Sequence, residues 1–196
     1  MPAALDPADQ LRAAVEAYQR HGNPAALFDM IRHLAETVPA DKLKEACVPF
    51  IDMPEVVIPV YERVSAALPE DAQAMVVLAN AYWLAGRGPE MVGELAARAI
   101  SADGGNRGAW HLWALSESNV RERVARWQQV SHRFPADQLA RAALADNAAS
   151  LAGAEHDPLA LDLAISTYGG LLDEATHPAQ RAALEATLKT LRGWTL

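Results

Sequence analysis

The most reactive side chain in the sequence is the thiol of Cys47, the single cysteine of the chain. One cysteine cannot form an internal disulfide. A thiol nucleophile needs a base such as histidine close by, but Cys47 instead stands among apolar residues at helical spacing. We therefore interpret Cys47 as a small buried hydrophobe.

Two short clusters combine histidine with carboxylates, the residue types that bind metal ions or act as general bases. The first is Glu-His-Asp at 155–157, directly before Pro158. An aspartate followed by proline is typical of a helix start, so we interpret Asp157 as an N-cap. The second, at 173–177, lies in a predicted loop. No P-loop, G-x-G-x-x-G, H-E-x-x-H, G-x-S-x-G or C-x-x-C motif occurs. We predict no catalytic, cofactor-binding or metal-binding residue, and no cofactor.

The composition indicates an ordered all-α chain. Of the 196 residues, 51% are hydrophobic and 21% are charged, which is typical of folded proteins. Alanine and leucine dominate and prolines recur at intervals, which favours helices over strands. The net charge of -8 argues against non-specific nucleic-acid binding. The sequence has no apolar run of ~18 residues and no basic leader before an apolar run. We therefore expect no membrane span and a cytoplasmic location.

A predicted helical hairpin at residues 70–103 is the element around which the chain is organised. Two apolar stripes at helical spacing define it: Met75, Leu78, Ala79 and Tyr82, and then Met91, Leu95, Ala96 and Ala99. Between them, the segment 86–89 combines a glycine that favours helix ends with a proline that favours helix starts. Small residues at 79 and 96 allow the two helix axes to approach closely. The hairpin cannot cover both stripes alone, so it requires neighbouring hairpins.

This hairpin resembles the tetratricopeptide repeat (TPR). The matching residues are M-x-x-L-A-x-x-Y at 75–82, Gly86, the small Ala99 and the turn at 103–104. Methionine at 75 and glycine at 104 depart from the tryptophan and proline of the family pattern. The turn landmarks Pro39, Pro69, Gly104 and Pro135 recur at intervals near the ~34 residues of a TPR unit. The resemblance covers 70–135, extends more weakly to about 175, and implies a right-handed α-solenoid of antiparallel helix pairs, about ten to eleven helices in all.

We expect a single helical-repeat domain, residues 1–196, in three parts. These are irregular N-terminal helices at 1–69, TPR-like repeats at 70–175 and a C-terminal capping helix at 176–196. In the first part, Asp41 is expected to cap the third helix. Pro59 is expected either to kink the fourth helix or to mark a start later than Pro54.

Downstream of the hairpin, the sequence predicts a helix that begins at Asn106. Where the family pattern has tryptophan, leucine, a small residue and tyrosine, this helix carries Trp110, Trp113, Ala114 and Glu117. The resemblance therefore implies that these residues form its packing stripe. Asn119 is expected to cap the helix that follows.

The resemblance also implies a binding groove, because the first helix of each TPR pair lines a concave surface. The residues it places there are Gln73, Val76, Asn80 and Trp83, then Gly108, His111, Leu115 and Ser118, and then Leu139, Ala142, Asp146 and Ala149. Asn80 occupies a position where some TPR proteins hold a peptide backbone or a terminal carboxylate. Val76 and His111 replace the lysines and arginines that would accompany such a clamp. The resemblance therefore implies a mixed groove in which Trp83 is an apolar anchor, unless Trp83 packs on a neighbouring helix.

Four arginines, with His132, cluster on one predicted helix: Arg121, Arg123, Arg126 and Arg133. Two interpretations remain open, an ordinary solvated face and a docking face for an acidic protein or nucleic acid. The negative net charge favours a protein over a nucleic acid.

The leading hypothesis is a non-enzymatic adaptor that binds a peptide or a partner domain in the groove. A second hypothesis is a structural subunit that forms a homo-oligomer through its N-terminal helices or Trp194. A third is a small-molecule-binding or catalytic helical domain, with Trp110, His111 and Trp113 around a pocket.

Overall fold

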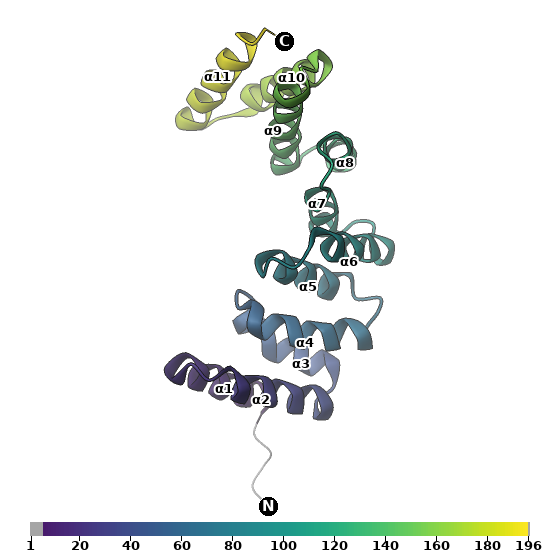
Figure 1. The fold of residues 1–196 in the computed structure, drawn as a ribbon, viewed down its shortest axis with the longest axis vertical. Helices are drawn as coiled ribbons and strands as arrows, with labels where there is room; N and C mark the ends of the chain where they lie inside the picture. The colour runs from purple at the N-terminus through teal and green to yellow at the C-terminus, as the bar shows by residue number, and fades with distance from the viewer. Residues whose placement is uncertain (1–5, 196) are drawn as a thin grey trace, which may run out of the picture. The chain divides into compact units, whose positions relative to one another are not determined.

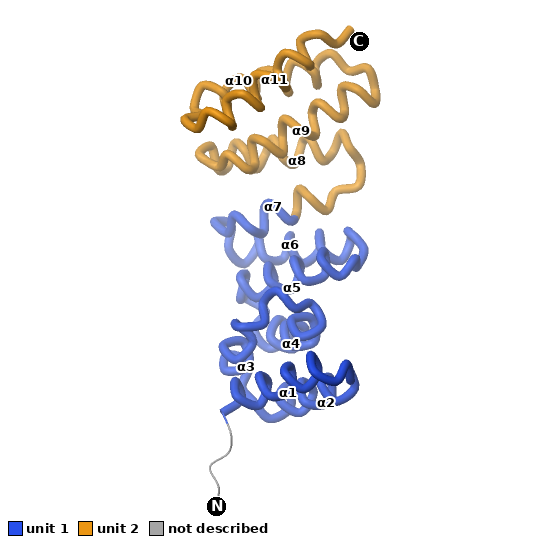
Figure 2. Tube along the Cα trace, turned by 90° about the vertical axis from the view of Figure 1, so that its left-hand side faces the viewer, with its two compact units in different colours: residues 1–112 blue, residues 113–196 orange. Residues whose placement is uncertain are grey.

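The chain is helical throughout the residues that the structure describes. A computed structural model describes residues 6–195, and within that range it contains eleven α-helices, one short 3-10 helix and no strand. The predicted all-α class is therefore confirmed. The chain divides into two compact units, residues 1–112 and 113–196, with the division inside the helix α7 (Figure 2).

Unit 1 is built from helices that pack on their neighbours in sequence (Figure 1). They are α1 (Pro7–His21), α2 (Pro24–Thr37), α3 (Ala40–Cys47), the 3-10 helix η1 (Val48–Phe50), α4 (Pro54–Ala67), α5 (Ala72–Leu84) and α6 (Pro89–Ala102), and α7 (Arg107–Leu115) begins here. The helix α1 also contacts α3, and α2 contacts α4. Contacts between helices two apart in sequence are what a stack of hairpins requires.

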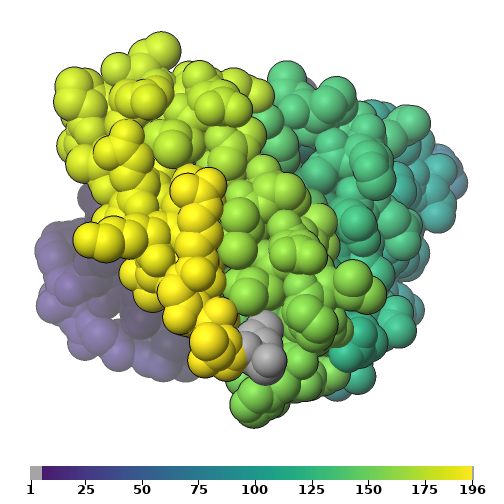
Figure 3. Space-filling model, turned by 90° about the horizontal axis from the view of Figure 1, so that it is seen from above, coloured from purple at the N-terminus to yellow at the C-terminus, as the bar shows by residue number. Residues whose placement is uncertain are grey.

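Unit 2 contains four further helices. They are α8 (Val120–Arg133), α9 (Gln138–Glu155), α10 (Pro158–Glu174) and α11 (Pro178–Arg192). The helix α9 packs against both α8 and α10, and α11 packs on α10. Figure 3 shows α11, in yellow, on the surface beside the lime-green residues of α10.

Short polar side chains begin most of these helices, because they satisfy backbone N–H groups that have no partner within the helix. The caps predicted at Asn119 and Asp157 are confirmed. Asn119 Oδ1 accepts a hydrogen bond from the N–H of Glu122 at 3.1 Å. Asp157 Oδ1 accepts from the N–H groups of Leu159 and Ala160, at 3.0 and 3.1 Å.

The central hairpin is confirmed as α5 and α6. Its first stripe is buried as predicted, and Ala79 and Ala96 are both fully buried. Gly86 follows α5 with φ of 68°, the left-handed region that glycine adopts without steric strain. The Tyr82 hydroxyl donates to Glu62 Oε1 of α4 at 2.7 Å, which ties the hairpin to the preceding helix.

Two local predictions in unit 1 are wrong, and one of the two alternatives for Pro59 is excluded. Asp41 does not cap α3, because that helix begins at Ala40 after Pro39 and has no side-chain cap. Pro59 does not mark a later start, because α4 begins at Pro54 and continues through Pro59. Met91 is 42% exposed, and Val92 takes the buried position instead. Val92 is the residue that shares a helix face with the other three members of the second stripe.

Of the predicted stripe of α7, only Ala114 is buried. Ala109, Leu112 and Ala114 are buried, whereas Trp110 and Trp113 are half-buried and the helix ends at Leu115, before Glu117. Polar contacts explain the two tryptophans. The Trp110 indole N–H donates to the carbonyl of Gly104 at 3.0 Å, and the Arg126 guanidinium lies over the Trp113 ring at 4.6 Å.

Asp71 joins α3 to the start of α5. Its Oδ1 caps α5 by accepting from the N–H of Ala74 at 2.9 Å, and its other oxygen pairs with Lys44 Nζ. Burial alone would raise the pKa of the Asp71 carboxyl, but the hydrogen bonds from Lys44 and Ala74 lower this pKa below its ordinary value.

Replacing Asp71 with alanine is therefore expected to lower the free energy of unfolding by about 1–2 kcal/mol at neutral pH. Because the folded pKa is depressed, this contribution is present above the unfolded carboxyl pKa of about 3.9 and is lost as the pH falls through the folded value. Urea unfolding followed by circular dichroism at pH 7 and again in acid measures both effects. Asp41→Ala is the control, because Asp41 is exposed and caps nothing. Equal losses in the two variants would contradict the assignment.

Candidate functional site

The four groove residues predicted on α5 lie on one accessible face of that helix. Gln73 and Asn80 are exposed, Val76 is half-buried and Trp83 is 40% exposed. The buried residues of α5 lie on the opposite side, as the turn of about 100° per residue requires. Leu84, which is 59% exposed and lies four residues after Asn80, extends this face with a further exposed apolar side chain. Sequence reasoning missed Leu84, although its spacing from Gln73 and Asn80 was visible.

The start of α7 lies beside this face within unit 1. Asn106 Nδ2 donates to Gln73 Oε1 at 3.3 Å. A Cβ atom added at Gly108 would lie 3.2 Å from Val76 Cγ1, so glycine at 108 allows α7 to approach closely. His111, one turn further along α7, is half-buried. We name this surface the α5 face and define it as Gln73, Val76, Asn80, Trp83 and Leu84.

Asn80 and Trp83 each offer a polar group of the α5 face to another molecule. Within residues 6–195, neither the Asn80 amide nor the Trp83 indole N–H has a hydrogen-bond partner. An amide can both donate to and accept from a peptide backbone, and an indole combines a large apolar surface with one donor.

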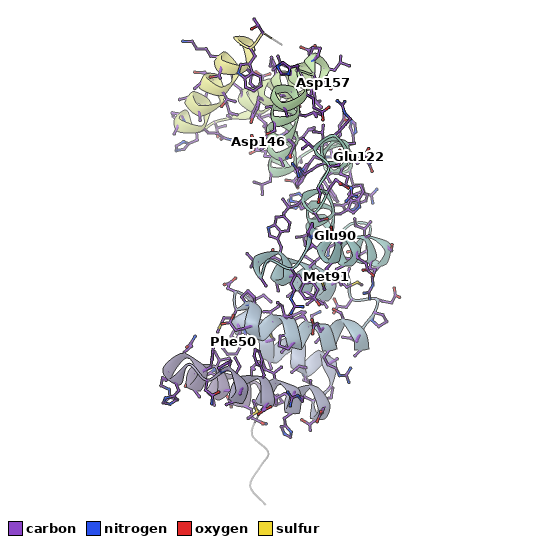
Figure 4. The ribbon with its side chains drawn as sticks, in the orientation of Figure 1. Phe50, Glu90, Met91, Glu122, Asp146 and Asp157 are labelled. Atoms are coloured by element: carbon purple, nitrogen blue, oxygen red, sulfur yellow. The ribbon has the colours of Figure 1, made fainter. Side chains whose placement is uncertain are left out.

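The remaining predicted groove residues lie in unit 2 and differ in their surroundings. Leu115 is exposed at the last position of α7, and Ser118 lies in the loop that follows, because the helix ends before it. Asp146 projects from α9 and accepts a hydrogen bond from the hydroxyl of Tyr168 on α10 (Figure 4). Burial, and then this hydrogen bond, raise the pKa of Tyr168. The Asp146 carboxylate therefore connects α9 to α10.

Three of the four clustered arginines contact other elements of unit 2. Arg121 pairs with Glu155 and, at 3.0 Å, with Asp157. Arg123 donates to Asn147 Oδ1 at 2.7 Å and to the Glu117 carbonyl at 2.9 Å. Arg126 donates to the Trp113 carbonyl at 2.7 Å. Arg133 is exposed near the end of α8. These contacts favour the interpretation of the cluster as a structural helix surface over a docking face.

The Cys47 thiol lies in surroundings that suppress its reactivity. Cys47 is fully buried, and burial raises the pKa of its thiol to about 12, which leaves almost no thiolate at neutral pH. Among residues 6–195, no group of three histidine, cysteine, aspartate or glutamate side chains is arranged to hold a metal ion. In the same range, no helix combines the length and apolar character that crossing a membrane requires.

Comparison with known proteins identifies the class of fold. No protein-family model and no curated protein sequence matches the chain. The MamA RS-1 ArsTM double mutant superposes on it with a TM-score of 0.57 at 14% identity, over 94% of this chain and 98% of the other. A thermophilic TPR protein from Thermus thermophilus superposes with a TM-score of 0.52 at 18% identity, over 95% and 98%. The chain therefore has a TPR-like fold, an all-α solenoid of helical repeats, as the sequence predicted.

Proposed function

We propose that this chain is a non-enzymatic protein-interaction module that binds a peptide, or an extended segment of a partner domain, on the α5 face. The observation that carries the proposal is the pairing of a 40% exposed Trp83 with the Asn80 amide one turn before it. The TPR-like fold supports it, because such folds are typically interaction scaffolds rather than enzymes.

The residues of the α5 face indicate what kind of peptide would bind. Trp83 and Leu84 offer apolar area, so the peptide is expected to carry an aromatic or large aliphatic side chain. The Asn80 amide is suited to hold one peptide group of the backbone. No lysine or arginine belongs to the α5 face, so a free terminal carboxylate is not required.

A peptide selection on the full chain tests the proposal. Peptides enriched from an unbiased phage-displayed library are synthesised, and their dissociation constants are measured by calorimetry. Trp83→Ala is expected to weaken binding about 30-fold or more, because a central aromatic anchor contributes about 2 kcal/mol or more. Asn80→Ala is expected to weaken binding about tenfold. Circular dichroism verifies that both variants are folded.

Met91→Ala is the matched control, since Met91 is exposed to a similar degree as Trp83 but lies on α6. Its dissociation constant is expected to stay within about twofold of the wild type. The proposal fails if no peptide is enriched, or if the three variants bind equally well. Light scattering on the same samples tests the self-associating alternative, which requires a mass that is a multiple of 21.1 kDa.

A further inference from the structure

A crevice of about 410 Å³ lies within unit 2, walled by α8, α9 and α10. Its lining residues include Gln128, Ser131 and His132 of α8, Arg141 of α9, and Thr167 and Gly170 of α10. It is a separate site from the α5 face, which belongs to unit 1.

The same crevice recurs in unit 1, with a volume of about 280 Å³, between α4, α5 and α6. The recurrence follows from the sequence, which reads V-S-x-x-L-P-x-D at 64–71 and V-S-x-x-F-P-x-D at 130–137. Ser65 and Ser131 hold the same place in this motif, and each lines the crevice of its own unit. Within the described part of the chain, both hydroxyl oxygens are buried without a hydrogen-bond partner. Buried hydroxyls normally form hydrogen bonds. Because the unbonded serine occurs at the same motif position in both units, we interpret it as a feature of the repeat.

The two crevices differ in charge. In unit 1, Glu62 and Glu94 line the crevice, and the hydrogen bond from Tyr82 to Glu62 crosses it. In the register of the motif, Gln128 corresponds to Glu62 and Ala148 to Tyr82. On the third wall, Ser166 of α10 lines the unit 2 crevice, whereas Glu94 of α6 lines that of unit 1. Among the described residues, no carboxylate lines the unit 2 crevice. It is therefore larger in volume than its counterpart and lacks the lining carboxylates that its counterpart carries.

Arg141 gives the unit 2 crevice a surplus of hydrogen-bond donors. Its two terminal nitrogens bind Glu174, one of them at 2.7 Å, and its Nε is buried with no partner in the described residues. The Ser131 hydroxyl is a second donor without an acceptor. The Thr167 hydroxyl already donates to the carbonyl of Leu163 at 2.7 Å. The side chains of Gln128 and His132 add further donors near the opening.

We propose that this crevice binds the carboxylate of an aspartate or glutamate side chain from a protein partner. Ionised acceptors form the strongest hydrogen bonds with such donors, and a carboxylate supplies two oxygens, one for Arg141 and one for Ser131. Neighbouring atoms cover both donor atoms, so binding requires Ser131 to rotate about its single χ1 torsion and the side chains over Arg141 Nε to move aside.

Nuclear magnetic resonance titration of the full chain, labelled with nitrogen-15, tests this proposal with N-acetyl-glutamate amide as the probe. We expect saturable shifts of the Arg141 Nε–H signal and of the backbone signals of Ser131 and Gly170. N-acetyl-glutamine amide, which has the same shape without the charge, is expected to give no saturable shift at these positions.

Two adjacent glycines of α10 provide a matched pair of variants. A Cβ atom would meet nothing within 4 Å at either Gly169 or Gly170, so both positions accept a side chain, but only Gly170 lines the crevice. Gly170→Met is expected to weaken probe binding at least about tenfold, and Gly169→Met to leave it within about twofold. The proposal is overturned if the charged probe gives no saturable shift, if the neutral probe binds equally well, or if both variants lose binding equally. None of these outcomes bears on the α5 face, whose binding is measured with variants of unit 1.

Discussion

Replacing Trp127 with alanine is expected to lower the free energy of unfolding by about 3–5 kcal/mol, the largest effect of any single substitution considered for this chain. Trp127 is 5% exposed and lies on α8 between the buried Val124 and Val130. These three residues are the buried members of α8, so removal of the indole deletes much of the apolar surface that holds the helix in unit 2. The loss combines the transfer free energy of the ring with the cavity that remains.

Trp83→Ala is the control for Trp127→Ala, because it deletes the same atoms from a side chain that is 40% exposed. Its effect on stability is expected to be smaller, about 1–2 kcal/mol, because less apolar area is removed from water and no closed cavity remains at the surface. Urea unfolding followed by far-ultraviolet circular dichroism measures both variants against the wild type. A Trp127→Ala loss no larger than the Trp83→Ala loss would contradict the burial of Trp127.

The second large effect is expected from Ala96→Leu, which should lower the free energy of unfolding by about 1–3 kcal/mol or more. Ala96 of α6 is fully buried where α6 packs on α5, and Ala79 of α5 is equally buried. Small residues at both positions allow the helices to pack closely, and a closely packed interior has no room for three more carbon atoms. The helices must therefore move apart or the leucine must adopt a strained rotamer.

Ala97→Leu separates this steric effect from the helix propensity of leucine. Ala97 is the next residue of α6 and is exposed, so its replacement is expected to change stability by less than about 0.5 kcal/mol. Thermal unfolding of the two variants provides the comparison. If Ala96→Leu is as stable as Ala97→Leu, the close packing of α5 on α6 is not the feature that holds the central hairpin together.

Local chemistry explains why the helical hairpins could be predicted from the sequence. The cap at Asn119, the turn at Gly86 and the stripe from Met75 to Tyr82 depend on residues within a few positions of one another, so their pattern is visible in the chain itself. The TPR-like class followed from the same features, because the family pattern consists of such short-range positions.

Other features depend on a distant residue and could not be predicted. The half-burial of Trp113 depends on Arg126 of the next helix, whose guanidinium lies over the indole ring. Asp146 is exposed on α9, but its carboxylate also accepts a hydrogen bond from Tyr168 of α10, a contact that its place in the sequence does not indicate. No spacing rule anticipates these partners, because they meet only through packing of helices.

The candidate sites show the same division between local pattern and packing. The residues Gln73, Val76, Asn80 and Trp83 share a helix face by spacing alone, so their exposure on one side of α5 could be predicted. The crevice at Ser131 could not, although the repeated V-S-x-x-[LF]-P-x-D motif was present in the sequence. Only the packing of three helices reveals that its serine hydroxyl has no acceptor.

Site-directed photo-crosslinking tests most directly whether a partner binds the α5 face. The photoreactive amino acid p-benzoylphenylalanine is placed either at Leu84 of the α5 face or at Ala97 on the exposed side of α6; neither substitution removes Asn80 or Trp83. With a peptide obtained by selection, irradiation is expected to give a covalent adduct from position 84 and none from position 97. Adducts from position 97 alone would place the partner on α6 and contradict the account.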